Sequence, residues 1–155
     1  MRSIFLTLLA TSVIAASAPT SQAADAPAKK DRVFELRIYT AHPGKLADLH
    51  KRFRDHTCKL FQKHGIELVG FWTPTEQPPP AKPVPQWAGL DGLSAENGLI
   101  YVVAFPSEEA RQKAWKAFRD DPEWKRVYAE SHKDGIIVKE VVFKVMQPVD
   151  YSPMK

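Results

Sequence analysis

Short stretches of the chain alternate hydrophobic with polar residues or are apolar throughout, and both patterns are typical of β-strands. In the first stretch Phe34 and Ile38 lie on one face. Glu35, Arg37 and Tyr39 lie on the other face. The third stretch is apolar along its whole length, which predicts a strand buried on both faces. The pattern predicts four strands, over residues 33–39, 66–73, 99–105 and 136–146.

Two other regions have the spacing of amphipathic helices. After Pro43-Gly44, apolar side chains fall within one arc at about 100° per residue until Gly65, a residue that commonly ends a helix. Ser107 and the two acids after it predict the start of a second helix, because they satisfy free amides and suit the positive helix end. Asp121 and Pro122 predict a restart of that helix, with Asp as N-cap and Pro at the first position.

The predicted elements follow one another as β-α-β-β-α-β. Each βαβ crossover is long enough to return a helix to one face of a sheet, which is the ferredoxin-like arrangement. We therefore expect an α+β domain with both helices on one face. The other face is expected to be rich in large apolar groups and poorly suited to water, so that two copies pack face to face as a homodimer, a dimeric α/β barrel. Residues assigned to that face are Glu35, Arg37, Tyr39, Phe71 or Trp72, Tyr101, Glu140 and Lys144.

The first 23 residues have the pattern of a secretory signal peptide, with Arg2 at the start, a short apolar run, and small residues that end at Ala23. The apolar run is shorter than the roughly 20 residues of a membrane span. We expect cleavage, export to the periplasm or the outside of the cell, and no stable membrane anchor afterwards. An uncleaved anchor is the alternative. Residues 24–31 are expected to form a flexible leader and 32–155 one domain.

The segment 74–98 is interrupted by several prolines. Proline cannot donate to a strand ladder, so this segment is expected to be a long loop between two hairpin strands. Loops of such length are uncommon in compact domains and are often functional or contact a partner.

Composition excludes several classes of function. The 22 Lys and Arg residues slightly outnumber the 18 Asp and Glu residues and form no basic stripe, so nucleic-acid binding is not expected. Cys58 is the only cysteine, which excludes an intrachain disulfide; it is either partly buried or an exposed thiol that links two chains. Motifs for phosphate loops, zinc proteases, serine hydrolases, flavins and metal centres are missing, so no cofactor is expected.

Eight short segments, taken in order, carry a family resemblance. They are Phe34–Tyr39, Pro43–Leu46, Phe53–Thr57, Lys63–Gly65, Val69–Trp72, Trp115–Phe118, Asp121–Trp124 and Asp150–Pro153. Together they resemble the NIPSNAP family over nearly all of residues 33–153. The resemblance implies the dimeric α/β barrel fold, whose wider superfamily includes cofactor-free monooxygenases and haem-handling enzymes. The loop at 74–98 is longer and richer in proline than this family pattern.

His56 is the candidate catalytic residue. It lies at the edge of the apolar arc of the first helix, so its side chain can point into the space between helix and sheet, where the barrel superfamily holds its ligand. A near-neutral pKa suits histidine to proton transfer. A structural histidine bonded to the backbone is the alternative. No metal site is expected on this helix, because His50 and His64 lie about 20 Å apart at 1.5 Å per residue.

Aromatic side chains around a pocket would suit a flat apolar ligand, although a packed core is the alternative use of such residues. Three functions are left open. The first is binding of a small apolar or aromatic ligand in a helix–sheet pocket. The second is a cofactor-independent enzyme, monooxygenase-like or isomerase-like, that uses His56. The third is a protein-interaction module that docks through the proline-rich loop. The candidate ligand-binding residues are Tyr39, His56, Trp72, Tyr101, Trp115 and Trp124.

Overall fold

The computed structural model describes residues 32–75 and 92–155. The predicted signal peptide, the leader and most of the proline-rich loop lie outside the described residues. Within the described residues, no helix is both long enough and apolar enough to cross a membrane. The elements are β1 (Val33–Ala41), α1 (Leu46–Arg52), η2 (Phe53–Thr57), α2 (Cys58–Lys63), β2 (Glu67–Trp72), β3 (Gly98–Phe105), α3 (Glu108–Asp120), α4 (Pro122–Ser131) and β4 (Val138–Met146).

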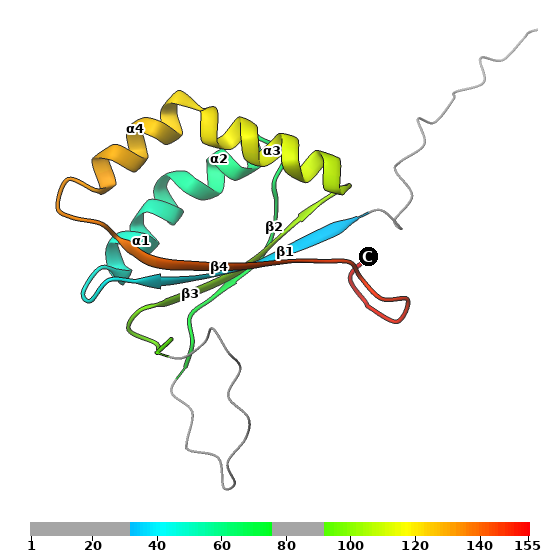
Figure 1. Cartoon of the computed structure of the whole chain (residues 1–155), viewed down its shortest axis with the longest axis horizontal. Coiled ribbons are helices and arrows are strands. Elements are labelled where there is room, and N and C mark those ends of the chain that lie inside the picture. The colour runs from blue at the N-terminus through cyan, green and yellow to red at the C-terminus, as the bar shows by residue number, and fades with distance from the viewer. Residues whose placement is uncertain (1–31, 76–91) are drawn as a thin grey trace, which may run out of the picture.

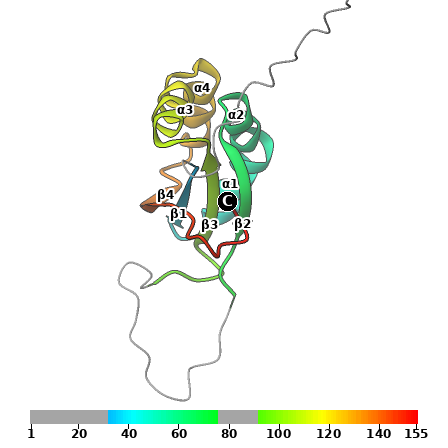
Figure 2. The same ribbon diagram turned by 90° about the vertical axis from the view of Figure 1, so that its right-hand side faces the viewer.

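The four strands form one antiparallel sheet in the order β2-β3-β1-β4. The three helical pieces α1, η2 and α2 are continuous, with a π turn at the centre, and α3 continues into α4 after a break at Asp121. Both helical layers cover the same face of the sheet, and the opposite face carries no helix of the described chain (Figures 1 and 2). The predicted α+β, ferredoxin-like β-α-β-β-α-β fold is therefore confirmed, with strand bounds that differ from the prediction by at most two residues.

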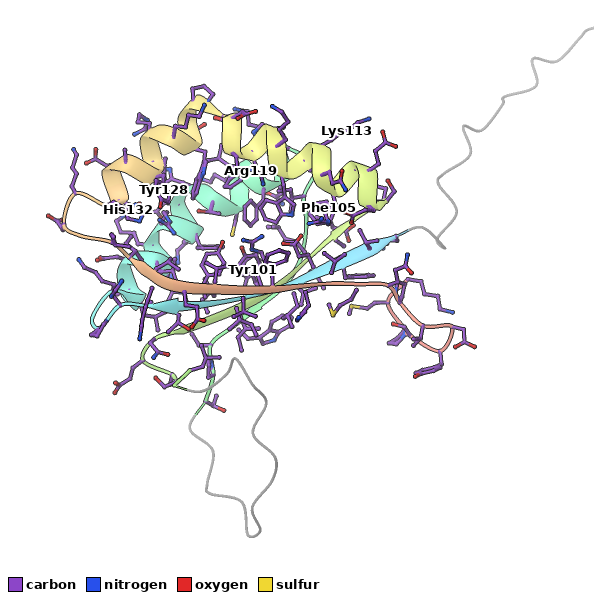
Figure 3. The ribbon with its side chains drawn as sticks, in the orientation of Figure 1. Tyr101, Phe105, Lys113, Arg119, Tyr128 and His132 are labelled. Atoms are coloured by element: carbon purple, nitrogen blue, oxygen red, sulfur yellow. The ribbon has the colours of Figure 1, made fainter. Side chains whose placement is uncertain are left out.

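The prediction of which residues face away from the helices is wrong for β1 and β3. The indole Nε1 of Trp115 on α3 donates to Glu35 at 2.8 Å, so Glu35 faces the helices. Tyr39 packs edge-on against Phe53 of η2, and Tyr101 lies between the sheet and the helices (Figure 3). These polar groups point inward because each finds a partner there. The strand alternation then turns Phe34 and its even-numbered neighbours on β1 toward the helix-free face.

Glu35 is a buried polar group of the core with both carboxylate oxygens hydrogen-bonded. Its side chain is fully buried, and its two oxygens accept hydrogen bonds from Arg37 at 2.6 Å, Arg111 at 2.7 Å and the indole of Trp115. The guanidinium of Arg37 also lies 4.7 Å from the centre of the Trp115 ring. Because a buried carboxylate needs charged partners and several donors, this cluster fixes α3 against β1.

Aromatic rings fill the rest of the helix-facing core. Tyr101 is fully buried and stacks on Phe71, with ring centres 5.3 Å apart. Phe61 of α2 contacts Trp115 and Phe118 of α3 edge-on, at 5.3 and 4.9 Å. Each such pair contributes about 0.5–1.5 kcal/mol beyond the area it buries. The two helical layers are thus joined to each other as well as to the sheet.

Asp121 joins the two helical layers at one end, as the predicted cap. One carboxylate oxygen accepts from the backbone N–H groups of Glu123 and Trp124, which begin α4. The other contacts Lys63 at 2.8 Å and His64 at 2.7 Å at the end of α2. The hydrogen bonds from Lys63 and His64, with the two backbone bonds, hold the pKa of Asp121 well below its usual range.

The helix-free face of the sheet is apolar and partly uncovered. Trp72 is 52% exposed and lies flat over Gly70, where an added Cβ would meet the indole at 2.5 Å. Only a glycine leaves room for the ring in this position. At the other end of the face, Phe34 is buried near the C-terminal tail, where Arg32 donates to the carbonyl of Lys155 at 2.8 Å.

Replacing the buried carboxylate tests its role in the fold. We expect Glu35→Ala to lower the free energy of unfolding by about 3–5 kcal/mol, because it leaves Arg37 and the indole N–H of Trp115 without their acceptor and removes one of the two carboxylates that Arg111 binds. Urea denaturation followed by circular dichroism measures the change. Glu109→Ala is the control, since within residues 32–75 and 92–155 Glu109 pairs only with the exposed Lys113, which points away from the sheet (Figure 3). Equal stability of the two variants would contradict this account.

Candidate functional site

A cavity of about 210 Å³ lies between the helices and the sheet. Its floor is formed by β1 and β4, one wall by the continuous helix of α1, η2 and α2, and the other by α3 and α4. Most of its walls are aromatic or aliphatic, which suits an apolar ligand. The lining residues are Tyr39, Arg52, Phe53, Thr57, Phe61, Phe118, Trp124, Tyr128, Val138 and Val141.

Arg52 is the charged residue in this lining. It is only 5% exposed, and its guanidinium lies 5.5 Å from the ring centre of Trp124 and 5.7 Å from that of Tyr128. Among the described residues its side chain donates one hydrogen bond, from Nη1 to Ser131 Oγ at 3.2 Å, and its buried Nε has no partner. No described carboxylate forms an ion pair with it. Burial lowers the pKa of Arg52, and nearby tyrosine hydroxyls oppose this shift.

The π turn η2 places Arg52 at the cavity. A π turn holds one more residue than an α turn, and such turns are frequent at functional sites. Thr57, which is fully buried, donates from Oγ1 to the carbonyl of Arg52 at 3.2 Å across this turn. The wider turn lets Arg52, Phe53 and Thr57 all face inward, so a cation, a ring and a hydroxyl converge on one side of the helix.

Two tyrosine hydroxyls meet beside the cavity. Tyr101 donates to the hydroxyl of Tyr39 at 3.1 Å, and Tyr39 itself lines the cavity. Burial first, and the neighbouring Tyr39, raise the pKa of Tyr101 well above its usual range, so this phenol keeps its proton at neutral pH. Tyr39 thus supplies a hydroxyl for hydrogen bonding at the cavity floor.

His56 lines a different space. A groove of about 210 Å³ runs between the first helix and α4, and its lining includes His56 and Ile137. Arg52 stands between the groove and the cavity and contributes to both. The groove is rich in charged side chains of both signs, unlike the aromatic cavity. Its acidic residues are Asp48, Asp55, Glu130 and Asp134, and its basic residues other than Arg52 are Lys51 and Arg126.

The structure brings together some of the residues predicted for the site and separates others. Tyr39 and Trp124 line the cavity. Tyr101 and Trp115 are buried in the core beside it. His56 faces the groove instead of the helix–sheet space that the sequence predicts. Trp72 lies on the helix-free face of the sheet. Their roles in binding or catalysis stay predictions.

The sequence analysis missed Arg52, Thr57 and Tyr128 as site residues. Arg52 falls at the edge of the apolar arc, where a long basic side chain ordinarily reaches solvent. The sequence contains one weak signal for Arg52: this cation lies next to Phe53, on a helix whose apolar face is otherwise uncharged. The described residues contain no group of three or more histidines, cysteines or acids that could hold a metal ion.

Replacing Arg52 tests whether its charge stabilises the fold. We expect Arg52→Met to raise the free energy of unfolding by about 0.5–2 kcal/mol, because the variant removes a desolvated cation that has no acid partner while it keeps the volume. Thermal and urea unfolding measure the change. Arg54→Met, on the exposed side of the same helix, is the matched control and should change little. A loss of stability in Arg52→Met would mean that the guanidinium holds the fold together.

Comparison with known proteins agrees with the fold. Residues 34–78 and 81–153 match the NIPSNAP family. No curated protein matches the sequence. A NIPSNAP-like domain protein from Burkholderia xenovorans has a TM-score of 0.61 at 16% identity, covering 80% of this chain and 90% of that one. A NIPSNAP family protein from Agrobacterium tumefaciens has a TM-score of 0.60 at 21% identity, covering 81% and 96%. The family match spans most of the chain, and the protein belongs to the NIPSNAP family.

Proposed function

We propose that this protein binds a small aromatic ligand in the cavity between its helices and its sheet. The observation that carries the proposal is the cavity itself, which is lined by the rings of two tyrosines, three phenylalanines and Trp124. Aromatic walls with a few polar groups are typical of sites for flat organic molecules. The hydroxyls of Tyr39 and Thr57 and the guanidinium of Arg52 supply those polar groups.

The volume limits the size of the ligand. An apolar cavity of about 150 Å³ is large enough to hold benzene. A cavity of about 210 Å³ therefore suits one aromatic ring with a short substituent and excludes a fused polycyclic ligand unless the walls move. Access is through the side at α4 and β4, because Tyr128 and Val141 line the cavity and are 49% and 40% exposed.

The cofactor-independent enzyme that uses His56 is the less supported alternative. Its imidazole lines the charged groove, so an aromatic molecule in the cavity and this histidine are separated by Arg52. A reaction in the cavity would have to use Tyr39, Thr57 or Arg52 instead. The interaction module rests on the proline-rich loop, most of which lies outside the described residues.

We also propose that the chain is exported and works as a homodimer. Export is supported by the pattern of the first 23 residues. Dimerisation is supported by the helix-free face, where Trp72 and Met146 are exposed. On expression in a Gram-negative host we expect a periplasmic chain that begins at Ala24 and sediments as a dimer. Intact-mass measurement and analytical ultracentrifugation check both points; an unprocessed chain or a stable monomer would contradict one or the other.

Closing the entrance tests the proposed site. At roughly 0.5 kcal/mol per non-hydrogen atom, benzamide is expected to bind the wild-type protein with a Kd of about 0.5 mM. Val141→Trp should weaken this binding by about tenfold or more, because the indole would cover the entrance. Ligand-observed NMR titration and isothermal calorimetry provide the Kd.

Val145→Trp is the matched control for this experiment. Val145 lies on the same face of β4, is 41% exposed and does not line the cavity. Its replacement should leave the Kd for benzamide within about twofold of the wild-type value. If both tryptophan variants weaken benzamide equally, the cavity is not the site that binds it.

A further inference from the structure

The cavity contains one charged side chain, and that side chain lacks a counter-ion in the described chain. Arg52 is only 5% exposed. Its Nε has no acceptor, and its one hydrogen bond goes to a neutral hydroxyl. Arg37, a part-buried cation on the same side of the sheet, is neutralised by Glu35 at 2.6 Å. The positive charge at the cavity is therefore that of Arg52.

A buried cation without an anion is costly to the fold, and proteins neutralise such charges or pair them. Stacking on Trp124 and Tyr128 offsets only part of the lost hydration, because cation–π contacts contribute less than an ion pair with hydrogen bonds. The remaining donors of the guanidinium form a planar fork that matches a carboxylate. A bound anion would accept hydrogen bonds from the guanidinium donors that have no acceptor in the described chain, and it would neutralise their charge.

We infer that the cavity selects small aromatic carboxylates, with the carboxylate held by the guanidinium of Arg52 and the ring held by the aromatic walls. This inference rests on the proposed function and names the class of ligand for the same site. The ring would lie among Tyr39, Phe53 and Trp124, and the acid group would point toward the α1–α4 side of the cavity. A single cation matches a single negative charge, so a doubly charged phosphate ester is disfavoured.

The groove on the other side of Arg52 does not offer an equivalent site. Four carboxylates line it, and they repel an anion that approaches from that side. Of its basic residues, Lys51 pairs with Asp55, and the four acids outnumber Lys51, Arg52 and Arg126. The anion is thus directed to the cavity, where no carboxylate is present in the lining.

Benzoate and benzamide have nearly the same shape and differ in charge, so their comparison tests the inference. We expect the wild-type protein to bind benzoate about tenfold or more tightly than benzamide at low ionic strength and neutral pH. In Arg52→Met this preference should vanish, so that benzoate and benzamide bind the variant with Kd values within about twofold of each other. Arg52→Lys should keep part of the preference, because it retains the charge without the fork.

Two controls locate the effect. Lys51→Met removes the same charge from the neighbouring position, where the side chain is exposed, and should leave the benzoate preference within about twofold. Val141→Trp should weaken the binding of both probes by about tenfold or more. A benzoate Kd that is unchanged in Val141→Trp would place the anion in the groove and overturn the inference.

The remaining outcomes separate the inference from the proposed function. If benzamide binds and benzoate binds no more tightly, the cavity is a ligand site without anion selection, and the inference fails alone. If the preference persists in Arg52→Met, another group holds the anion, and the inference fails. If neither probe binds, the proposed function fails with it.

Discussion

The burial of Glu35 is the constraint on which the rest of this structure depends. A carboxylate on the odd-numbered side of β1 can be buried only if cations and donors reach it, and α3 supplies Arg111 and Trp115 for that purpose. This bond network decides which face of the sheet the helices cover. Once α3 is fixed in this way, Tyr39 and Tyr101 must face the helices, and the space that becomes the cavity is enclosed.

The order and type of the elements could be predicted from the sequence, because the hydrophobic periods and the caps act locally. Ser107 and Asp121 cap their helices as their positions indicate. The two faces of β1 could not be assigned, because alternation alone does not tell which side is buried when one set is apolar and the other charged. That choice depends on Arg111 and Trp115, about 80 residues later in the chain.

The candidate site was only partly predictable for a related reason. A helix drawn with a uniform angle per residue brings His56 near the apolar arc. The same drawing already places Thr57 inside that arc. In the structure this stretch is a π turn, Thr57 is buried as the arc predicts, and His56 lines the groove beside α4. No residue type in Phe53–Thr57 predicts the π turn. At its start Arg52 packs on Trp124 of α4 and Phe53 packs on Tyr101 of β3, and these long-range contacts cannot be read from the linear sequence.

The contact between Trp72 and Gly70 determines the shape of the helix-free face at this edge of the sheet. The indole of Trp72 occupies the space that a side chain at position 70 would fill, so its ring packs against the strand at this edge. Any larger residue at position 70 would push the indole outward without disturbing the helix-covered interior. Variation at this single glycine would therefore reshape what the protein presents to a neighbouring molecule while its own interior stays as it is.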